Sequence, residues 1–292
     1  MLLKKIGTLL LCSFSLLTAN AQQKAREKSS LLWEISGKDL KSPSWLYGTI
    51  HMICAEDLHF SQATQDALKK VKSLYLEIDM SDQEEMQSLQ SSLMMPEGYS
   101  LKALVSEAEY KQLADWCQDS LHTNIAALDR FKPLVLLSLV ARQHFTSSCQ
   151  HPASCEAELM KIAQTQQLPV HGLEKATDQV AIFDSIPDKD EAQMILKTIG
   201  DPVKTQEIYS KMIKAYKAQD INALSVLMAE TEDMVQYKDL LLDQRNRNWV
   251  PIIASEAAKA PTFFAVGAGH LGGNTGVIEL LRKQGYTVKP IQ

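Results

Sequence analysis

Two histidines, His51 and His270, each close a Gly-x-x-His segment, at residues 48–51 and 267–270. An apolar stretch precedes the glycine in both segments, which indicates a β-strand that ends in a tight turn. Ligands of α/β sheets bind outside the carboxyl ends of the strands, and neutral imidazole is the commonest metal ligand in proteins. The two histidines could therefore share one metal ion, although a single histidine after a strand is more often a polar cap.

Two carboxylates extend this candidate site. Glu77 and Asp79 lie on one face of a strand predicted over residues 73–79, at its carboxyl end. Glu77 could complete a His–His–Glu metal set or act as a general base, and the alternative is a solvated residue at the sheet edge. The chain has no His-Glu-x-x-His motif, so the usual zinc-protease helix does not apply. A set of histidines and carboxylates would accept zinc, manganese, cobalt or iron.

Strand and helix patterns alternate at both ends of the chain, and helices fill the middle. Strands are predicted at residues 31–36, 45–50, 73–79, 169–174, 262–267 and 286–291, and helices at 61–71, 106–120, 133–145, 156–166, 190–199, 203–219, 222–248 (with a break) and 276–284. This pattern predicts an α/β fold, with a central mixed sheet, flanking helices and a large helical insertion or cap between the two Gly-x-x-His strands. Without a convincing linker, we expect a single domain over residues 31–292.

The first 21 residues have the features of a signal peptide. Lys4 and Lys5 precede an apolar run over residues 9–17, and Ala19 and Ala21 provide the small residues that signal peptidase reads. We expect cleavage after Ala21, export to the periplasm or the cell exterior, and a flexible polar leader over residues 22–30. The alternative is a short membrane anchor, but the run is shorter than the roughly 20 apolar residues that span a bilayer. No later segment is apolar enough to be transmembrane.

The charge of the chain argues against nucleic acid as a partner. The formal net charge is −5 and becomes −7 when Lys4 and Lys5 leave with the signal peptide. A mildly acidic chain without a basic stripe does not provide the electrostatic footprint that nucleic acids require.

Export would permit disulfide bonds between the remaining cysteines. Four cysteines allow three pairings, and the sequence does not choose among them; they are Cys54, Cys117, Cys149 and Cys155. We favour Cys149–Cys155, which would close a short loop around His151. The alternatives are four buried free thiols or a zinc site formed by Cys149, His151 and Cys155, whose spacing matches no standard ligand pattern.

Together these residues resemble the TraB/GumN family, which includes the Tiki proteases. The matching segments follow the order of the family and cover nearly all of the mature chain: YGTIH at 47–51, LEID at 76–79, GLE at 172–174 with Gln179, RN at 245–246, and VGAGHLGG at 266–273. The resemblance implies a relation to erythromycin-esterase-like and ChaN-like folds and metal-dependent hydrolysis, with peptide cleavage attributed to the Tiki members. Carried over by position, His51, Glu77 and His270 would be the central site.

Other charged residues are secondary candidates. Arg245 could orient a carboxylate or stabilise negative charge that develops on a substrate, and the alternative is a surface arginine at a helix end. Glu174 is either a second carboxylate near the site or a residue that starts a helix. His171 lies at a strand end before Gly172, and Asp79 follows Glu77 on the same predicted strand face.

We therefore predict a secreted metal-dependent hydrolase, most concretely a peptidase, that acts on a peptide or small-molecule substrate. His51, Glu77 and His270 would bind a divalent metal ion, and Glu77 and Arg245 would take part in catalysis. The alternatives are a protein that binds haem or another ligand, of the ChaN-like type, and a metal-independent esterase with a histidine base. A catalytically silent member would share the same fold. The oligomeric state, the substrate and the identity of the metal cannot be derived from the sequence.

Overall fold

The computed structural model describes residues 29–146, 149–230 and 232–292. The predicted signal peptide (1–21) and residues 22–28 of the predicted leader lie outside these ranges. Ser29 and Ser30, the last two residues of that leader, pack against the fold. Ser30 is fully buried and its hydroxyl donates to the Ile291 carbonyl at 2.5 Å. The Ser29 hydroxyl accepts a hydrogen bond from the Ile221 N–H at 2.9 Å.

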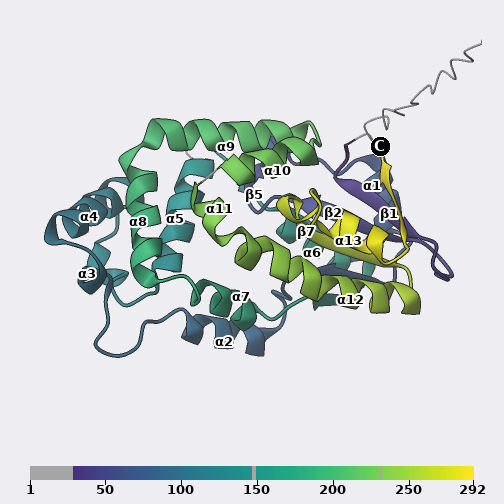
Figure 1. Ribbon diagram of the computed structural model, residues 1–292, viewed down its shortest axis with the longest axis horizontal. Coiled ribbons are helices and arrows are strands. Elements are labelled where there is room, and N and C mark those ends of the chain that lie inside the picture. The colour runs from purple at the N-terminus through teal and green to yellow at the C-terminus, as the bar shows by residue number, and fades with distance from the viewer. Residues whose placement is uncertain (1–28, 147–148, 231) are drawn as a thin grey trace, which may run out of the picture.

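A six-stranded sheet forms the centre of the molecule (Figure 1), with the strand order β6-β4-β7-β2-β1-β8. The strands are β1 (Leu32–Ser36), β2 (Ser44–Thr49), β4 (Ser73–Leu76), β6 (Val170–Gly172), β7 (Thr262–Gly267) and β8 (Thr287–Ile291). Strands β6, β4, β7 and β2 are parallel to one another, while β1 is antiparallel to both β2 and β8. The sheet is mixed, which confirms the predicted fold class.

The register places the two Gly-x-x-His turns side by side. Every residue of β2 and all but the last residue of β7 are buried, as expected for central strands that are covered on both faces. In the parallel pairing of these strands, Gly48 lies opposite Val266 and Thr49 opposite Gly267. Strand β4 pairs with the other side of β7. The carboxyl ends of β2, β7 and β4 therefore meet at one edge of the sheet.

Ten of the thirteen helices in the described residues belong to two groups (Figure 1). Their bounds are α1 (Gln62–Leu68), α2 (Gln83–Ser92), α3 (Leu101–Leu104), α4 (Glu107–Leu121), α5 (Pro133–Thr146), α6 (Cys155–Gln166), α7 (Ala176–Phe183), α8 (Asp188–Gly200), α9 (Pro202–Lys217), α10 (Ile221–Glu230), α11 (Glu232–Lys238), α12 (Gln244–Lys259) and α13 (Val277–Lys283). Side chains of α1, α6, α9, α10, α12 and α13 pack with the sheet into one core, whereas those of α3, α4, α5 and α8 enclose a second hydrophobic core. The second group is the predicted helical insertion. Helices α2, α7 and α11 contribute to neither core.

Local signals in the sequence set several helix ends. Ser61 caps α1 by accepting from the Thr64 N–H, and Ser106 forms the predicted capping box with Glu109 at the start of α4. The long helix predicted over residues 222–248 is interrupted, as expected. It continues through a π-helical segment, Asp239–Asp243, into α12, which runs to Lys259 with Pro251 inside it. The predicted end at residue 248 was therefore wrong.

The cysteine pairing differs from the favoured prediction. Cys54 is bonded to Cys149, while Cys117 and Cys155 are buried free thiols. A short ribbon explains this, because β3 (Ile53–Cys54) pairs with β5 (Pro152–Ala153) and brings Cys54 to the loop that holds Cys149. Cys155 opens α6 and faces the core, where its sulfur lies 3.1 Å from the Tyr216 hydroxyl. The Cys149–Cys155 bond, the four free thiols and the zinc site at Cys149 were therefore wrong.

A helix that spans a bilayer needs roughly 20 consecutive, predominantly apolar residues. None of the helices within the described residues is long and apolar enough to cross a membrane.

Candidate functional site

Arg245 lies between two buried carboxylates at the carboxyl edge of the sheet. Its Nη2 atom is 2.5 Å from Glu77 Oε2 and 2.6 Å from Glu174 Oε1, and its Nε atom is 3.0 Å from Glu174 Oε1. Nη1 donates to the Leu241 carbonyl at 3.2 Å and lies 3.2 Å from His270 Nε2. A guanidinium has five N–H donors, and protein groups engage all of them here. This geometry favours the carboxylate-orienting role over donation to a substrate.

Neighbouring residues of the same helix hold the Arg245 side chain in its orientation. Arg245 is the second residue of α12, directly after the π-helical segment, and the Leu241 carbonyl that it contacts lies within that segment. π-Segments inside α-helices occur frequently at functional sites. One turn later, the Trp249 ring lies 4.6 Å from the guanidinium carbon, and its indole N–H donates to Glu174 Oε2 at 3.0 Å. The indole therefore supports both members of the Arg245–Glu174 pair.

Glu77 links the ends of β4 and β7. The strand predicted over residues 73–79 ends at Leu76, and Glu77 follows in a bend. Its Oε1 atom accepts the Gly267 N–H at 2.7 Å, while Oε2 contacts Arg245. Burial alone would raise the pKa of Glu77, but the neighbouring positive charge of Arg245 and the Gly267 N–H hold it below its ordinary value. The buried side chain is therefore a carboxylate.

Glu174 belongs to the same cluster, although it also lies just before α7. Gln179 Nε2, on α7, is 3.0 Å from Glu174 Oε1 and 3.3 Å from Glu77 Oε2. Of the two roles considered for Glu174, the second carboxylate near the site agrees better with these contacts. Glu174 also lies just before α7, so the position at a helix start and the place in the carboxylate cluster are compatible.

His270 is a buried neutral imidazole. Its Nδ1 atom lies 2.7 Å from Asn246 Oδ1, and the Asn246 amide nitrogen donates to the Thr275 carbonyl at 2.9 Å, which fixes the orientation of the amide. Nδ1 of the ring therefore carries the hydrogen, and the Nε2 lone pair faces Arg245. Burial lowers the pKa of His270 to about 3. Its Nε2 atom is 3.9 Å from Glu77 Oε1.

His51 lies at the surface beside this cluster. Its side chain is 71% exposed, and its Nδ1 atom is 2.9 Å from Glu156 Oε1. The hydrogen bond to Glu156 raises the pKa of His51 to about 9. Sequence reasoning missed Glu156, because a glutamate in the first turn of a helix is an ordinary dipole-compensating residue. Asn246 was also missed as the partner of His270, although the family resemblance contained the Arg245–Asn246 pair.

The distances between the ligand atoms of His51, Glu77 and His270 decide whether these side chains could hold one metal ion. With bonds of about 2.1 Å, one ion can join a nitrogen and an oxygen up to roughly 4.2 Å apart, so the His270–Glu77 separation of 3.9 Å fits. An ion on His270 Nε2 would compete with the Arg245 N–H. Within the described residues, His51, Glu77 and His270 do not form a group whose ligand atoms all lie within 4.8 Å of one another. Two of the three residues thus fit one ion, and the exposed His51 ring would have to turn toward it.

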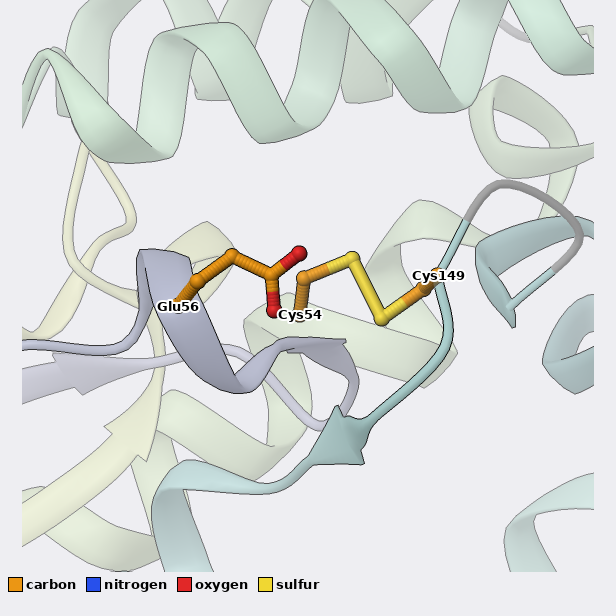
Figure 2. A group of neighbouring side chains, drawn as sticks. All are labelled: Cys54, Glu56 and Cys149. Carbon is orange, nitrogen blue, oxygen red and sulfur yellow. A yellow bond between two sulfur atoms is a disulfide. The ribbon is translucent and has the colours of Figure 1, made fainter.

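A different group meets that distance criterion in the described part of the chain, namely Cys54, Glu56 and Cys149. Figure 2 shows the Glu56 carboxylate beside the bond between the two sulfur atoms. Metal binding requires the thiolate form of cysteine, which a disulfide does not provide. This group is therefore a poor metal site.

The two remaining candidates lie away from the cluster. Asp79 Oδ1 accepts the Ser81 N–H at 2.9 Å and contacts the Ser81 hydroxyl at 2.5 Å, so this carboxylate stabilises a turn. His171, on the edge strand β6, is exposed, and its ring lies 4.9 Å from that of Tyr75. The strand prediction that put Asp79 and Glu77 on one face fails because β4 ends before both residues.

The chain is similar in sequence to metalloproteases from vertebrates. The chain is 22% identical to the metalloprotease TIKI1 of Xenopus tropicalis, and the match covers 91% of this chain and 62% of the relative. It is 20% identical to the metalloprotease TIKI2 of Danio rerio, and the match covers 90% of this chain and 61% of the relative. It thus spans less than two thirds of the length of these relatives. No solved structure matches the chain. The TraB/PrgY/gumN family model matches residues 31–290, and the chain therefore belongs to the TraB/PrgY/gumN family, as the resemblance implied.

Proposed function

We propose that this protein is an exported metal-dependent hydrolase that cleaves peptide bonds, with His51, Glu77 and His270 as the metal ligands. The observation that carries the proposal is the pairing of a neutral buried His270 with an ionised Glu77, their ligand atoms 3.9 Å apart, at an edge where three strand ends meet. The names of the relatives, metalloproteases from vertebrates, support the peptidase part.

The residues around the two buried ligands prepare them for a cation. Asn246 keeps the hydrogen of His270 on Nδ1, so that the ring presents the Nε2 lone pair, which a metal ion could take in place of the Arg245 N–H that now faces it. Arg245 and the Gly267 N–H keep Glu77 ionised. A neutral imidazole and a carboxylate are the protonation states that metal binding requires.

A divalent ion held by these side chains would supply Lewis acidity to the scissile carbonyl and to a water molecule. Zinc, manganese, cobalt and iron all accept this donor set. The role of the chain is to hold the ligands in place. Arg245 orients Glu77 and Glu174 through bonds to both carboxylates, and the engaged donors of its guanidinium leave none for the substrate.

The proposal is tested with the mature chain purified free of metal. Hydrolysis of a fluorogenic peptide library is measured without metal and after addition of Zn²⁺, Mn²⁺, Co²⁺ or Fe²⁺, with the variants Glu77→Gln and His270→Ala. The matched control is His122→Asn, because His122 is an exposed histidine with positive φ at the end of α4, a conformation that asparagine tolerates.

We expect activity only with added metal, a loss of at least 100-fold in Glu77→Gln and His270→Ala, and unchanged activity in His122→Asn. Peptide cleavage that persists in chelator would refute the metal requirement. Ester hydrolysis in chelator without peptide cleavage would instead support the metal-independent esterase. Stoichiometric haem binding that depends on His51, without any hydrolysis, would support the ligand-binding alternative.

Export is a separate part of the proposal, supported by the residues of the first 21 positions. The mature protein is expected to begin at Gln22 and to appear in the periplasm or the medium. Amino-terminal sequencing of the protein from a fractionated expression host measures both. A chain that keeps Met1 and stays in the cytoplasm would contradict this part without affecting the hydrolase proposal.

A further inference from the structure

Strand β6 leaves one edge of the central sheet open. It is the outermost strand on its side, and among the described residues only β4 pairs with it. The Leu74 N–H on β4 donates to the Pro169 carbonyl at 3.0 Å, and bonding residues alternate along a parallel pair. Pro169 and His171 therefore face β4, whereas the N–H and C=O groups of Val170 and Gly172 face outward. No hydrogen bond from another described residue reaches these outward groups.

The opposite edge of the sheet has residues that discourage strand addition. That edge is β8, which pairs with β1 alone in the described part of the chain. Strand β8 contains Lys289 and Pro290, and natural sheets use lysine and proline on edge strands to prevent pairing with another chain. Strand β6 has the sequence Val-His-Gly and contains neither. The β6 edge is therefore the one at which a further strand could pair.

An apolar groove lies beside this open edge. Its volume is about 600 Å³, and its apolar lining comes from Leu168 and Val170 at β6, from Met160 on α6 and from Met80 in the loop after β4. We call it the edge groove. Alternate side chains of a strand project to the same face of a sheet. Those of a strand added next to β6 would therefore enter the groove beside Val170.

The two methionines suit the edge groove to an apolar side chain. Met80 is 39% exposed although it lines the groove. Its loop lies close to β6 because residue 172 is a glycine, where a Cβ atom would be 2.9 Å from the Asp79 backbone nitrogen. The methionine side chain is flexible and polarisable and adapts to apolar groups of different shape. Met80 and Met160 can therefore accept apolar side chains without selecting a single one.

The size of the edge favours a single extended peptide over a second folded copy of the chain. Strand β6 is three residues long, and the lining of the edge groove consists of eight described residues. Stable interfaces between folded proteins involve roughly 20–30 residues on each side. A strand of a few residues with one apolar side chain matches the β6 edge much better.

The leader of this chain is not suited to the groove either. Ser30 contacts the Ile291 carbonyl at the β8 edge, so residues 22–28 start from the opposite side of the sheet. The five strand spacings between β8 and β6 amount to about 24 Å. Seven fully extended residues span about the same distance, which leaves none to pair with β6.

We propose that β6 and the edge groove are the substrate-recognition site of the peptidase, an inference that rests on the proposed function. An extended peptide pairs with the outward groups of Val170 and Gly172 and places an apolar side chain against Met80 and Met160. In such strand addition the main-chain hydrogen bonds give affinity, and pockets for alternate side chains give selectivity. Glu174 follows Gly172 by two positions, so a peptide beside β6 runs toward the buried cluster.

The test measures peptide binding by fluorescence anisotropy with the mature chain in chelator, so that binding is read without metal-dependent cleavage. The probes are labelled peptides of about nine alanine, serine and threonine residues, within the usual length of a strand. They have a central leucine or a central aspartate. Two further leucine peptides have N-methyl groups on every second residue, in one register or in the other, because such groups remove the N–H donors along one edge of a strand.

The protein variants test the groove and the edge separately. Met80→Asp puts a charge into the groove, and its matched control is Met94→Asp, since Met94 is 40% exposed and does not line the groove. Val170→Pro removes an outward N–H, a change that edge strands tolerate. Val170→Thr is its control, because threonine keeps the N–H and the shape of valine. Circular dichroism reports the fold of every variant.

We expect the leucine peptide to bind about 10-fold or more tightly than the aspartate peptide, and Met80→Asp to lose about the same factor. Met94→Asp and Val170→Thr should bind like the parent. Val170→Pro should bind about 3- to 10-fold more weakly, as expected for one main-chain hydrogen bond. N-methyl groups in one of the two registers should abolish binding. If a Val170 variant does not fold, the N-methylated peptides test the edge on the unaltered protein.

Several results would overturn the inference without affecting the proposed hydrolase, which is measured by peptide cleavage with added metal. They are the absence of binding at about 1 mM peptide, binding that tolerates N-methyl groups in both registers, and equal binding of the leucine peptide to parent and Met80→Asp. A dimer in sedimentation that Met80→Asp dissociates would also overturn it and assign the edge to a second copy. Binding with the expected dependence but without cleavage under any metal would support the peptide site and refute the proposed hydrolase.

Discussion

Replacing Glu191 by glutamine should stabilise the protein progressively more as the pH rises. Glu191 lies on α8 in the helical insertion and is 2% exposed, and its Oε1 atom is without a hydrogen-bond partner among the described residues. Burial and the nearby Asp188 carboxylate raise its pKa from 4.5 to about 7, although the Leu134 N–H acts in the opposite direction. The folded protein therefore retains a proton on this carboxyl that the unfolded chain has lost.

The sign and size of the effect follow from proton linkage. Below pH 4.5 both states are protonated, so Glu191 does not affect the pH dependence of stability. Between pH 4.5 and pH 7 the folded state binds more protons, and stability falls as the pH rises. A difference of 2.5 units between the values of 4.5 and about 7 corresponds to about 3 kcal/mol, fully lost above pH 7. Glutamine does not titrate and escapes this loss.

Urea unfolding at intervals from pH 4 to pH 8 measures the effect in the parent and in Glu191→Gln. The buried glutamine amide changes the free energy of unfolding by an amount that does not depend on pH. The quantity to follow is therefore how the difference in unfolding free energy between the two proteins changes from pH 4 to pH 8. The control is Glu207→Gln, since Glu207 is an exposed glutamate paired with Lys211 at 2.7 Å. A difference that stays flat for Glu191→Gln would refute the raised pKa and the physical argument from burial.

Three further predictions concern the candidate site and its frame. Arg245→Ala leaves the two buried carboxylates that it bridges without their cation, and it should lower the free energy of unfolding by about 3–5 kcal/mol, measured by urea unfolding. Gly48→Ala would place a Cβ atom 2.7 Å from the buried Leu271 side chain and should cost about 1–3 kcal/mol, with a lower melting temperature as the readout. Replacing Cys54 and Cys149 together by alanine removes a crosslink between positions 95 apart in the sequence and should cost about 2–5 kcal/mol; equal melting temperatures with and without reductant in the parent would contradict this.

Local patterns in the sequence were sufficient to predict the elements that carry the candidate site. The apolar runs before Gly48 and Gly267 predict β2 and β7, and the predicted bounds of β7 are those of the structure. The capping box at Ser106 predicts the start of α4 in the same way. These signals depend on residues within one strand or one helical turn, so the sequence displays them directly. The end of β4 escaped prediction because Glu77 bends away to reach Gly267, a residue on another strand.

The sequence by itself determined that this chain is an α/β protein of its family, with two histidines at strand ends and a carboxylate after a third strand. Only the tertiary structure decided which partners these side chains have. Arg245 meets Glu77 across 168 positions, and Glu156 meets His51 across 105. Contacts over such separations depend on the packing of whole helices against the sheet, which no local periodicity encodes. The same reason explains why Cys149 pairs with Cys54 through the β3–β5 ribbon rather than with its neighbour Cys155.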